Sequence, residues 1–156
     1  MNLQTELDRE WRRLQGVGGT LQVSLDDGEV RGELPVVDRV GCETRSLLVS
    51  SQSLAGASTD RLARIGDDLA ARLTYLLEPL RVVEVDGQAQ VVQMRSVPPS
   101  ATPAGRSYFE VLVRAGGEIE LVRYAVTPGQ PRSPVPALFT REVFFRLVED
   151  LVEALA

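Results

Sequence analysis

Three segments of this chain have the pattern of β-hairpins, and they constrain its fold more than any other feature. Residues 20–34, 80–95 and 108–126 are rich in β-branched and aromatic residues, and each segment is interrupted near its centre by a tight-turn dipeptide. The dipeptide is Asp-Gly in the first two segments and Gly-Gly in the third, and both suit short connections between antiparallel strands. The sequence therefore predicts an antiparallel sheet built from hairpins.

The turn positions give the first two hairpins an expected register. A two-residue turn at Asp27-Gly28 places Leu25 opposite Val30 and leaves one face of the hairpin apolar. In the second hairpin, pairing Val83 with Val91 matches apolar residues best, and that register requires a bulge or a three-residue loop. Because valines occupy both faces of the second hairpin, we expect it to be central in the sheet and covered on both sides.

The third hairpin groups the most distinctive polar and aromatic residues. A turn at Gly116-Gly117 sets Glu110 opposite Arg123, with Tyr108 and Tyr124 near them. These four residues are our candidates for the wall of a small-molecule pocket between the sheet and a helix. An ordinary cross-strand ion pair explains the same pattern, and both interpretations remain open at this stage.

Three helices are predicted from apolar residues that recur every three or four positions. They cover about residues 3–15, 60–78 and 140–155, and Thr140 caps the last one. A further strand is predicted at residues 43–50. The resulting order of elements is α-β-β-β-α-β-β-β-β-α.

This order predicts an α+β fold in which helices pack on an antiparallel sheet. The length of 156 residues fits one domain, so we expect residues 1–156 to form a single unit. Pro-rich loops are expected at about residues 97–106 and 127–137.

The last predicted helix has an unusually wide apolar surface. At 100° per residue its apolar side chains sweep roughly 200° of the circumference, whereas one sheet face covers about 100°. The helix therefore needs a second covering surface besides the sheet, either another helix of this chain or a second subunit. Phe144, Phe145 and Val152 are our candidates for a partner surface on this helix.

The residue types that are missing exclude several kinds of chemistry. All 17 basic residues are Arg and there is no His, so a histidine base, a histidine-ligated metal and a lysine Schiff base are excluded. No motif marks a catalytic, cofactor-binding or metal-binding site, and we predict none. Cys42 is the single cysteine, which is expected either as a small buried hydrophobe or as a thiol activated by Arg39 or Arg45.

The net charge and the hydropathy of the chain argue against two classes of binding partner. The net charge of −5 and the pI of about 4.8 argue against nucleic acid, whose phosphates require a basic surface. The chain begins without a signal-peptide pattern and contains no apolar run of membrane-spanning length, so we expect no membrane partner. The lone cysteine fits a reducing compartment, and the expected location is the cytoplasm.

The order of elements, the length and the acidic pI are together similar to those of the dimeric α+β chaperones of bacterial secretion systems. This resemblance is one of topology, because no sequence motif carries it. With the missing catalytic residue types, it favours a non-enzymatic, chaperone-like bacterial protein that acts through self-association as a homodimer or through contacts with another protein. The alternative is a small-molecule binding domain, or an enzyme relying on carboxylates and Arg, with its pocket between sheet and helix.

Overall fold

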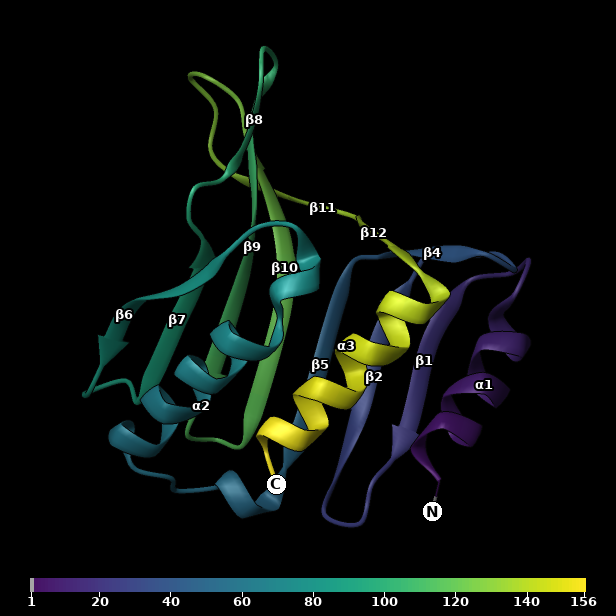
Figure 1. The fold of residues 1–156 in the computed structure, drawn as a ribbon, viewed down its shortest axis with the longest axis horizontal. Helices are drawn as coiled ribbons and strands as arrows, with labels where there is room; N and C mark the ends of the chain where they lie inside the picture. The colour runs from purple at the N-terminus through teal and green to yellow at the C-terminus, as the bar shows by residue number, and fades with distance from the viewer. Residues whose placement is uncertain (1) are drawn as a thin grey trace.

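The computed structural model describes residues 2–156 and is organised around one antiparallel sheet of nine strands. Seven of these strands lie side by side across the molecule (Figure 1). In spatial order they are β1 (Gly19–Ser24), β2 (Gly28–Leu34), β5 (Ser46–Ser51), β10 (Glu118–Val126), β9 (Gly105–Arg114), β7 (Val91–Ser96) and β6 (Leu80–Asp86). Two short strands, β8 (Ser100–Thr102) beside β9 and β11 (Ser133–Val135) beside β10, lengthen the central hairpin.

A second, smaller sheet lies at one end of the first. Its three strands are β12 (Ala137–Thr140), β4 (Gly41–Thr44) and β3 (Val36–Val37), in that spatial order. The predicted strand at residues 43–50 is thus divided at Arg45, because β4 pairs in the small sheet and β5 pairs in the main one.

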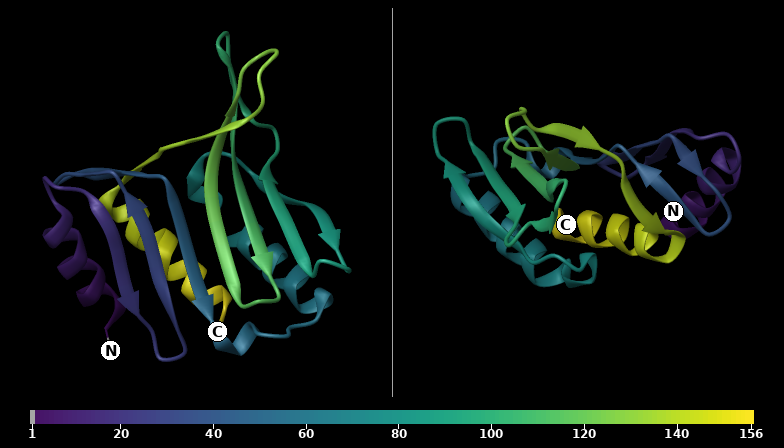
Figure 2. Two further views of the ribbon diagram at one scale, coloured as in Figure 1. Left: turned by 180° about the vertical axis from the view of Figure 1, so that it is seen from behind. Right: turned by 90° about the horizontal axis from the view of Figure 1, so that it is seen from above.

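The last two of the three helices lie on one face of the main sheet and the first lies beside its β1 edge, while the other face is bare, as the view from behind shows (Figure 2). The helices are α1 (Leu3–Leu14), α2 (Thr59–Arg72) and α3 (Arg141–Ala154). The α+β class, the antiparallel pairing and the helix–sheet order predicted from the sequence are confirmed. Within residues 2–156, no helix combines the length and the apolar character that crossing a membrane would need.

The helix ends follow from local chemistry. Asn2, Ser58 and Thr140 each accept a hydrogen bond from a backbone N–H in the first turn of the helix that follows, as N-cap residues do. The predicted extension of the second helix to residue 78 is wrong, because a short 3-10 turn replaces the α-helix after Leu73 and Leu77 has a positive φ of 66°.

The core lies between the helices and the covered face of the sheet, and α3 occupies its centre. Helix α3 contacts both α1 and α2, as well as β5 and the small sheet. Fully buried side chains come from all three helices and from both halves of the main sheet, and they include Leu7, Trp11, Leu62, Leu69, Phe144, Leu147, Leu21, Leu47, Met94 and Val111.

The first two hairpins depart from the predicted registers. In the first, Val23 rather than Leu25 lies opposite Val30, because the connection is longer than two residues. The shift is by two residues, so each side chain keeps its predicted face. In the second, the bulge lies inside β6, between Val82 and Glu84, and not at the turn where the predicted register required one, and Val85 rather than Val83 pairs near the turn, opposite Val92.

The predicted central position of the second hairpin is also wrong. Strand β6 is the outermost strand of the main sheet, and among the described residues no strand pairs with its outer side. Valine content predicted burial on both faces, but it carried no information about which strand comes next in the sheet.

Candidate functional site

The four predicted pocket residues do not share one face of the sheet. Tyr108 lies opposite Tyr124, Glu110 lies opposite Val122, and Arg123 lies opposite Phe109. The register differs by one residue from the predicted one, because three residues and not two connect β9 to β10. An odd shift moves one side chain of each predicted pair to the other face. The predicted Glu110–Arg123 pair is therefore wrong.

Glu110 points to the face that no helix covers, yet only 4% of its surface is exposed. Arg132, from the segment before β11, closes over it with a 3.2 Å ion pair, and Gln93 of β7 donates a hydrogen bond to the same carboxylate. Arg132 also stacks on Tyr124 at 3.9 Å from the ring centre and donates a hydrogen bond to the Tyr108 hydroxyl. These contacts fasten the chain around Arg132 to the sheet.

Arg123 points to the opposite face. Its guanidinium forms a 2.8 Å ion pair with Glu78, hydrogen-bonds Ser107, and lies 4.5 Å from the centre of the Phe109 ring. A pocket between sheet and helix could therefore include Arg123 but not Tyr108, Glu110 or Tyr124. The predicted pocket wall does not assemble in this structure.

The three candidate partner residues on α3 also separate. Phe144 is fully buried, with its ring centre 5.8 Å from that of Trp11, so it is part of the core and is removed from the candidate partner surface. The wide apolar surface of α3 is covered within the chain by α1, α2 and the sheet. Val152 is half-buried and lines a small hollow of about 300 Å³ beside Leu25 and Val49.

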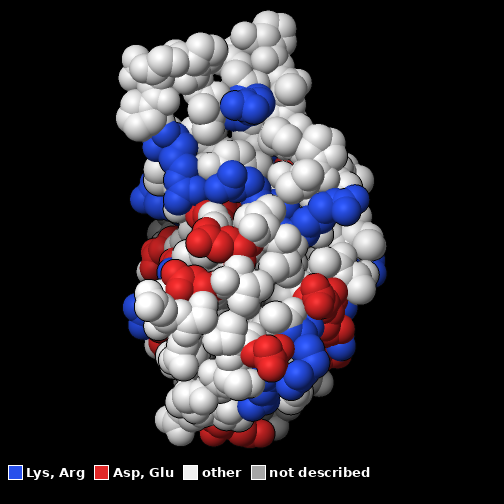
Figure 3. Space-filling model, turned by 90° about the vertical axis from the view of Figure 1, so that its left-hand side faces the viewer, with Lys and Arg blue, Asp and Glu red and all other residues white. Residues whose placement is uncertain are grey.

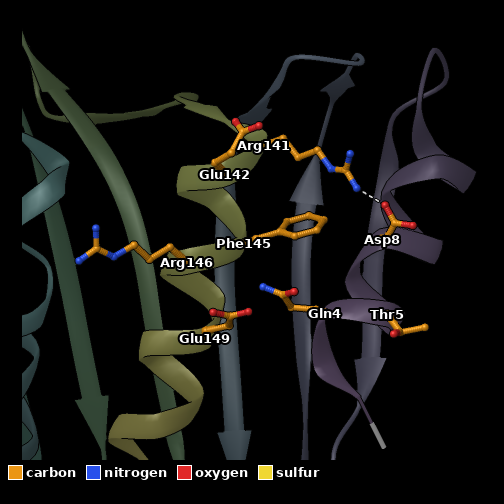
Figure 4. Close-up of a pocket in the computed structure, with 8 residues that line it drawn as sticks. All are labelled: Gln4, Thr5, Asp8, Arg141, Glu142, Phe145, Arg146 and Glu149. Atoms are coloured by element: carbon orange, nitrogen blue, oxygen red, sulfur yellow. Dashed lines mark hydrogen bonds and ion pairs between the residues drawn. The ribbon is translucent and has the colours of Figure 1, made fainter.

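Phe145 lies in a groove of about 650 Å³ between α1 and α3 (Figure 4). Its half-buried ring packs edge-on against Trp11, and the Arg141 guanidinium lies 5.0 Å from its centre. Arg141 forms an ion pair with Asp8 across the groove, while Arg146 points away from it toward the Tyr75 ring. The ion pair between Arg141 and Asp8 thus spans the groove at one end.

The small sheet carries a surface that sequence reasoning missed. Its inner side chains, which include Val37, Cys42 and Phe139, are buried in the core. On its outer side Leu138 is 75% exposed, Val40 68% and Val36 46%. Together Val36, Val40 and Leu138 form an apolar patch that lines a hollow of about 430 Å³.

The apolar patch is held in a defined shape. The Asp38 carboxylate accepts hydrogen bonds of 2.7 Å from the backbone N–H groups of Val40 and Gly41, and these bonds lower the pKa of Asp38. The Trp11 indole donates to the Asp38 carbonyl, which ties the same turn to α1. Glu43 lies directly between Val36 and Leu138 in the register, and so places one carboxylate within the patch.

Cys42 lies beneath the apolar patch and points inward. Burial raises the pKa of its thiol to about 11, only partly offset by the Thr44 hydroxyl at 3.4 Å. At neutral pH the thiol is therefore protonated, which favours the interpretation of Cys42 as a small buried hydrophobe over that of an activated nucleophile.

A signal for the patch is present in the sequence but weak. The segment before the last helix contains the large apolar residues Leu138 and Phe139, and the structure buries Ala137 and Phe139 while exposing Leu138. We predicted a Pro-rich loop there because prolines dominate the segment.

Across the described part of the chain, no three acidic or cysteine side chains gather closely enough to hold a metal ion.

Comparisons with protein-family models, with curated proteins and with solved structures give no match.

Proposed function

We propose that this protein is a non-enzymatic interaction module that binds another protein through the apolar patch and acts as a homodimer. The observation that carries this proposal is the outward exposure of Val36, Val40 and Leu138 on one side of the small sheet. Clustered exposed aliphatic side chains of this kind mark interaction surfaces. Covering a side chain such as Leu138 contributes about 1.5–3 kcal/mol when its burial is complete.

The rigidity of the patch supports the same proposal. Its turn is fixed by Asp38 and anchored to Trp11, so little conformational freedom is lost when a partner covers it. The chemistry of the partner follows from Glu43, which lies among the aliphatic side chains. A fitting partner surface has apolar side chains around one Lys or Arg.

The proposal is tested by a photo-crosslinking residue at position 36 in the producing cells. We expect one defined crosslinked product with another protein, whose crosslinked surface is apolar with a basic residue. The product should disappear in the Leu138→Glu background, because the change removes an exposed aliphatic side chain of the patch and sets a second carboxylate against the apolar side chains of the partner.

Gln130→Glu is the matched control, since Gln130 is exposed in the loop after β10 and away from the small sheet. A product that persists in Leu138→Glu at the level seen in Gln130→Glu would contradict binding at the patch. A product containing only a second copy of the chain would instead assign the patch to self-association.

A further inference from the structure

The two edge strands of the main sheet differ in whether their outward-facing backbone N–H and C=O groups have hydrogen-bond partners. Along β1, helix α1 replaces the missing neighbour. The Glu10 carboxylate accepts a 3.0 Å hydrogen bond from the backbone N–H of Gln22, and Arg13 donates a 2.7 Å bond to the carbonyl of Thr20. This edge is therefore blocked against further strands, as natural proteins commonly arrange.

The β6 edge has no such cover among the described residues. Val83 and Val85 are 45% and 48% exposed along it. An open edge with exposed valines is a template on which another strand can pair.

A bulge sets which side chains of β6 share a face. Leu80, Val82 and Val85 lie on the helix-covered face, opposite the buried side chains of Ser96, Met94 and Val92. Arg81 and Glu84 lie opposite Arg95 and Gln93, on the bare face. Because Val83 is the extra residue of the bulge, Arg81 and Glu84 point the same way although three positions separate them.

The charges on this edge are uncompensated. Arg81 lies directly opposite Arg95, and like charges in such positions destabilise a strand pair. Within residues 2–156, neither Arg81 nor Glu84 has an ion-pair partner. Figure 3 looks onto this side of the molecule, where a band of basic side chains crosses above acidic ones.

We propose that a second copy of this chain pairs antiparallel along β6, about a two-fold axis between Val82 and Val83. Arg81 then lies opposite the partner subunit's Glu84, and Glu84 opposite the partner subunit's Arg81. Two symmetric ion pairs compensate the charges left unpaired in the single chain. This assignment rests on the proposed homodimer and names its interface.

The apolar residues agree with the same axis. Leu80 comes to lie opposite the partner subunit's Val85, and Val82 opposite the partner subunit's Val83. Leu80 and Val85 both belong to the helix-covered face, so this pair joins side chains on one side of the sheet. Moving the pairing by one residue in either direction would set Glu84 against Leu80 or Val82 of the covered face, which antiparallel pairing does not allow. Since both copies carry the bulge at the axis, neither strand has a residue in excess.

The test uses charge reversal and sedimentation velocity at micromolar concentration. We expect the wild-type chain to be a dimer. Arg81→Glu and Glu84→Arg each place like charges opposite one another twice, and each should raise the dissociation constant at least tenfold. The double variant Arg81→Glu/Glu84→Arg restores both ion pairs and should restore the dimer.

Arg106→Glu is the control, because Arg106 is exposed, lies away from β6 and carries the same change of charge. Circular dichroism checks that each variant is folded. A wild-type dimer that both single variants leave unchanged would overturn the β6 interface while leaving the homodimer in place. A wild-type monomer would overturn both the β6 interface and the homodimer. The crosslinking experiment at position 36 would still test whether the apolar patch binds another protein.

Discussion

Glu10 is the single residue on which the blocked β1 edge depends most. Its carboxylate accepts hydrogen bonds from both the backbone of Gln22 and the Arg13 guanidinium, and its side chain is largely buried. The Arg13 hydrogen bond, followed by that from Gln22, outweighs desolvation and lowers the pKa of Glu10. No sequence pattern predicts this contact, because Glu10 and Gln22 meet only when α1 packs beside β1.

We expect Glu10→Gln to lower the free energy of unfolding by about 1–3 kcal/mol at neutral pH, because hydrogen bonds to a charged acceptor are lost. A lowered folded-state pKa stabilises the fold above the unfolded-state pKa of about 4.3, and this contribution disappears as the pH falls through the folded value. The difference between wild type and variant in urea unfolding should therefore shrink toward about pH 3.

Glu6→Gln is the matched control on the same helix, because the Glu6–Arg9 pair is more exposed and contributes less. A difference for Glu10→Gln that stays constant between neutral pH and about pH 3 would show that its charge is not the cause.

The predicted pocket shows where sequence reasoning about single residues ends. Alternation along β9 and β10 correctly indicates that neighbouring side chains take opposite faces. The length of the connecting turn then decides which residues meet, and one additional residue is enough to separate Glu110 from Arg123. Gly116-Gly117 marks the turn but not its length.

At the scale of elements, α2 lies close to the edge hairpin because of one glycine. A Cβ added at Gly66 would lie 3.1 Å from Val82 Cγ2 and 3.3 Å from Val92 Cγ1, closer than ordinary packing permits. The helix thus approaches β6 and β7 more closely than a larger residue would allow. Because Val82 adjoins the bulge, this contact also holds the open edge in position.

We expect Gly66→Leu to lower the free energy of unfolding by about 1–3 kcal/mol, because the additional side chain must displace the helix from the two strands. Denaturant titration measures the change. Ala71→Leu adds a side chain at an exposed position of the same helix and should have little effect. A Gly66→Leu variant as stable as the wild type, or more stable, would show that the gain in helix propensity outweighs the close approach.

The elements also show what periodicity can predict. It identified all three helices and the wide apolar surface of α3, but it could not say whether a helix or a second subunit covers that surface. The structure places Trp11 and the sheet against it. For β6 the valine-rich pattern predicted burial on both sides, which the single chain does not provide.

At the scale of the whole molecule, the covered helix α3 and the open edge strand β6 bear on the same question of self-association. The chain covers α3 by itself, whereas the valines and charges of β6 remain without partners. In the homodimer that we propose, β6 becomes an interior strand of a sheet that continues through both copies. The sequence pattern of β6 would then describe the assembly and not the single chain.

The two halves of the main sheet are joined at one seam. Strand β5 from the first half pairs with β10 from the second, with Leu47 opposite Leu121. Helix α3, the last element, lies across this region and contacts α1 on one side and α2 on the other. The halves therefore share one core, and neither has a complete apolar layer without α3.

This arrangement predicts that damage to α3 weakens both halves equally. Leu151 is fully buried, and Leu151→Ala should cost about 2–5 kcal/mol through the cavity it leaves. Because small domains with one core unfold cooperatively, amide hydrogen exchange in β1–β2 and in β7–β9 should accelerate by the same factor. Glu142→Ala, at an exposed position of α3, should change neither. Acceleration confined to one pair of strands would mean that the halves unfold independently and that α3 belongs to only one of them.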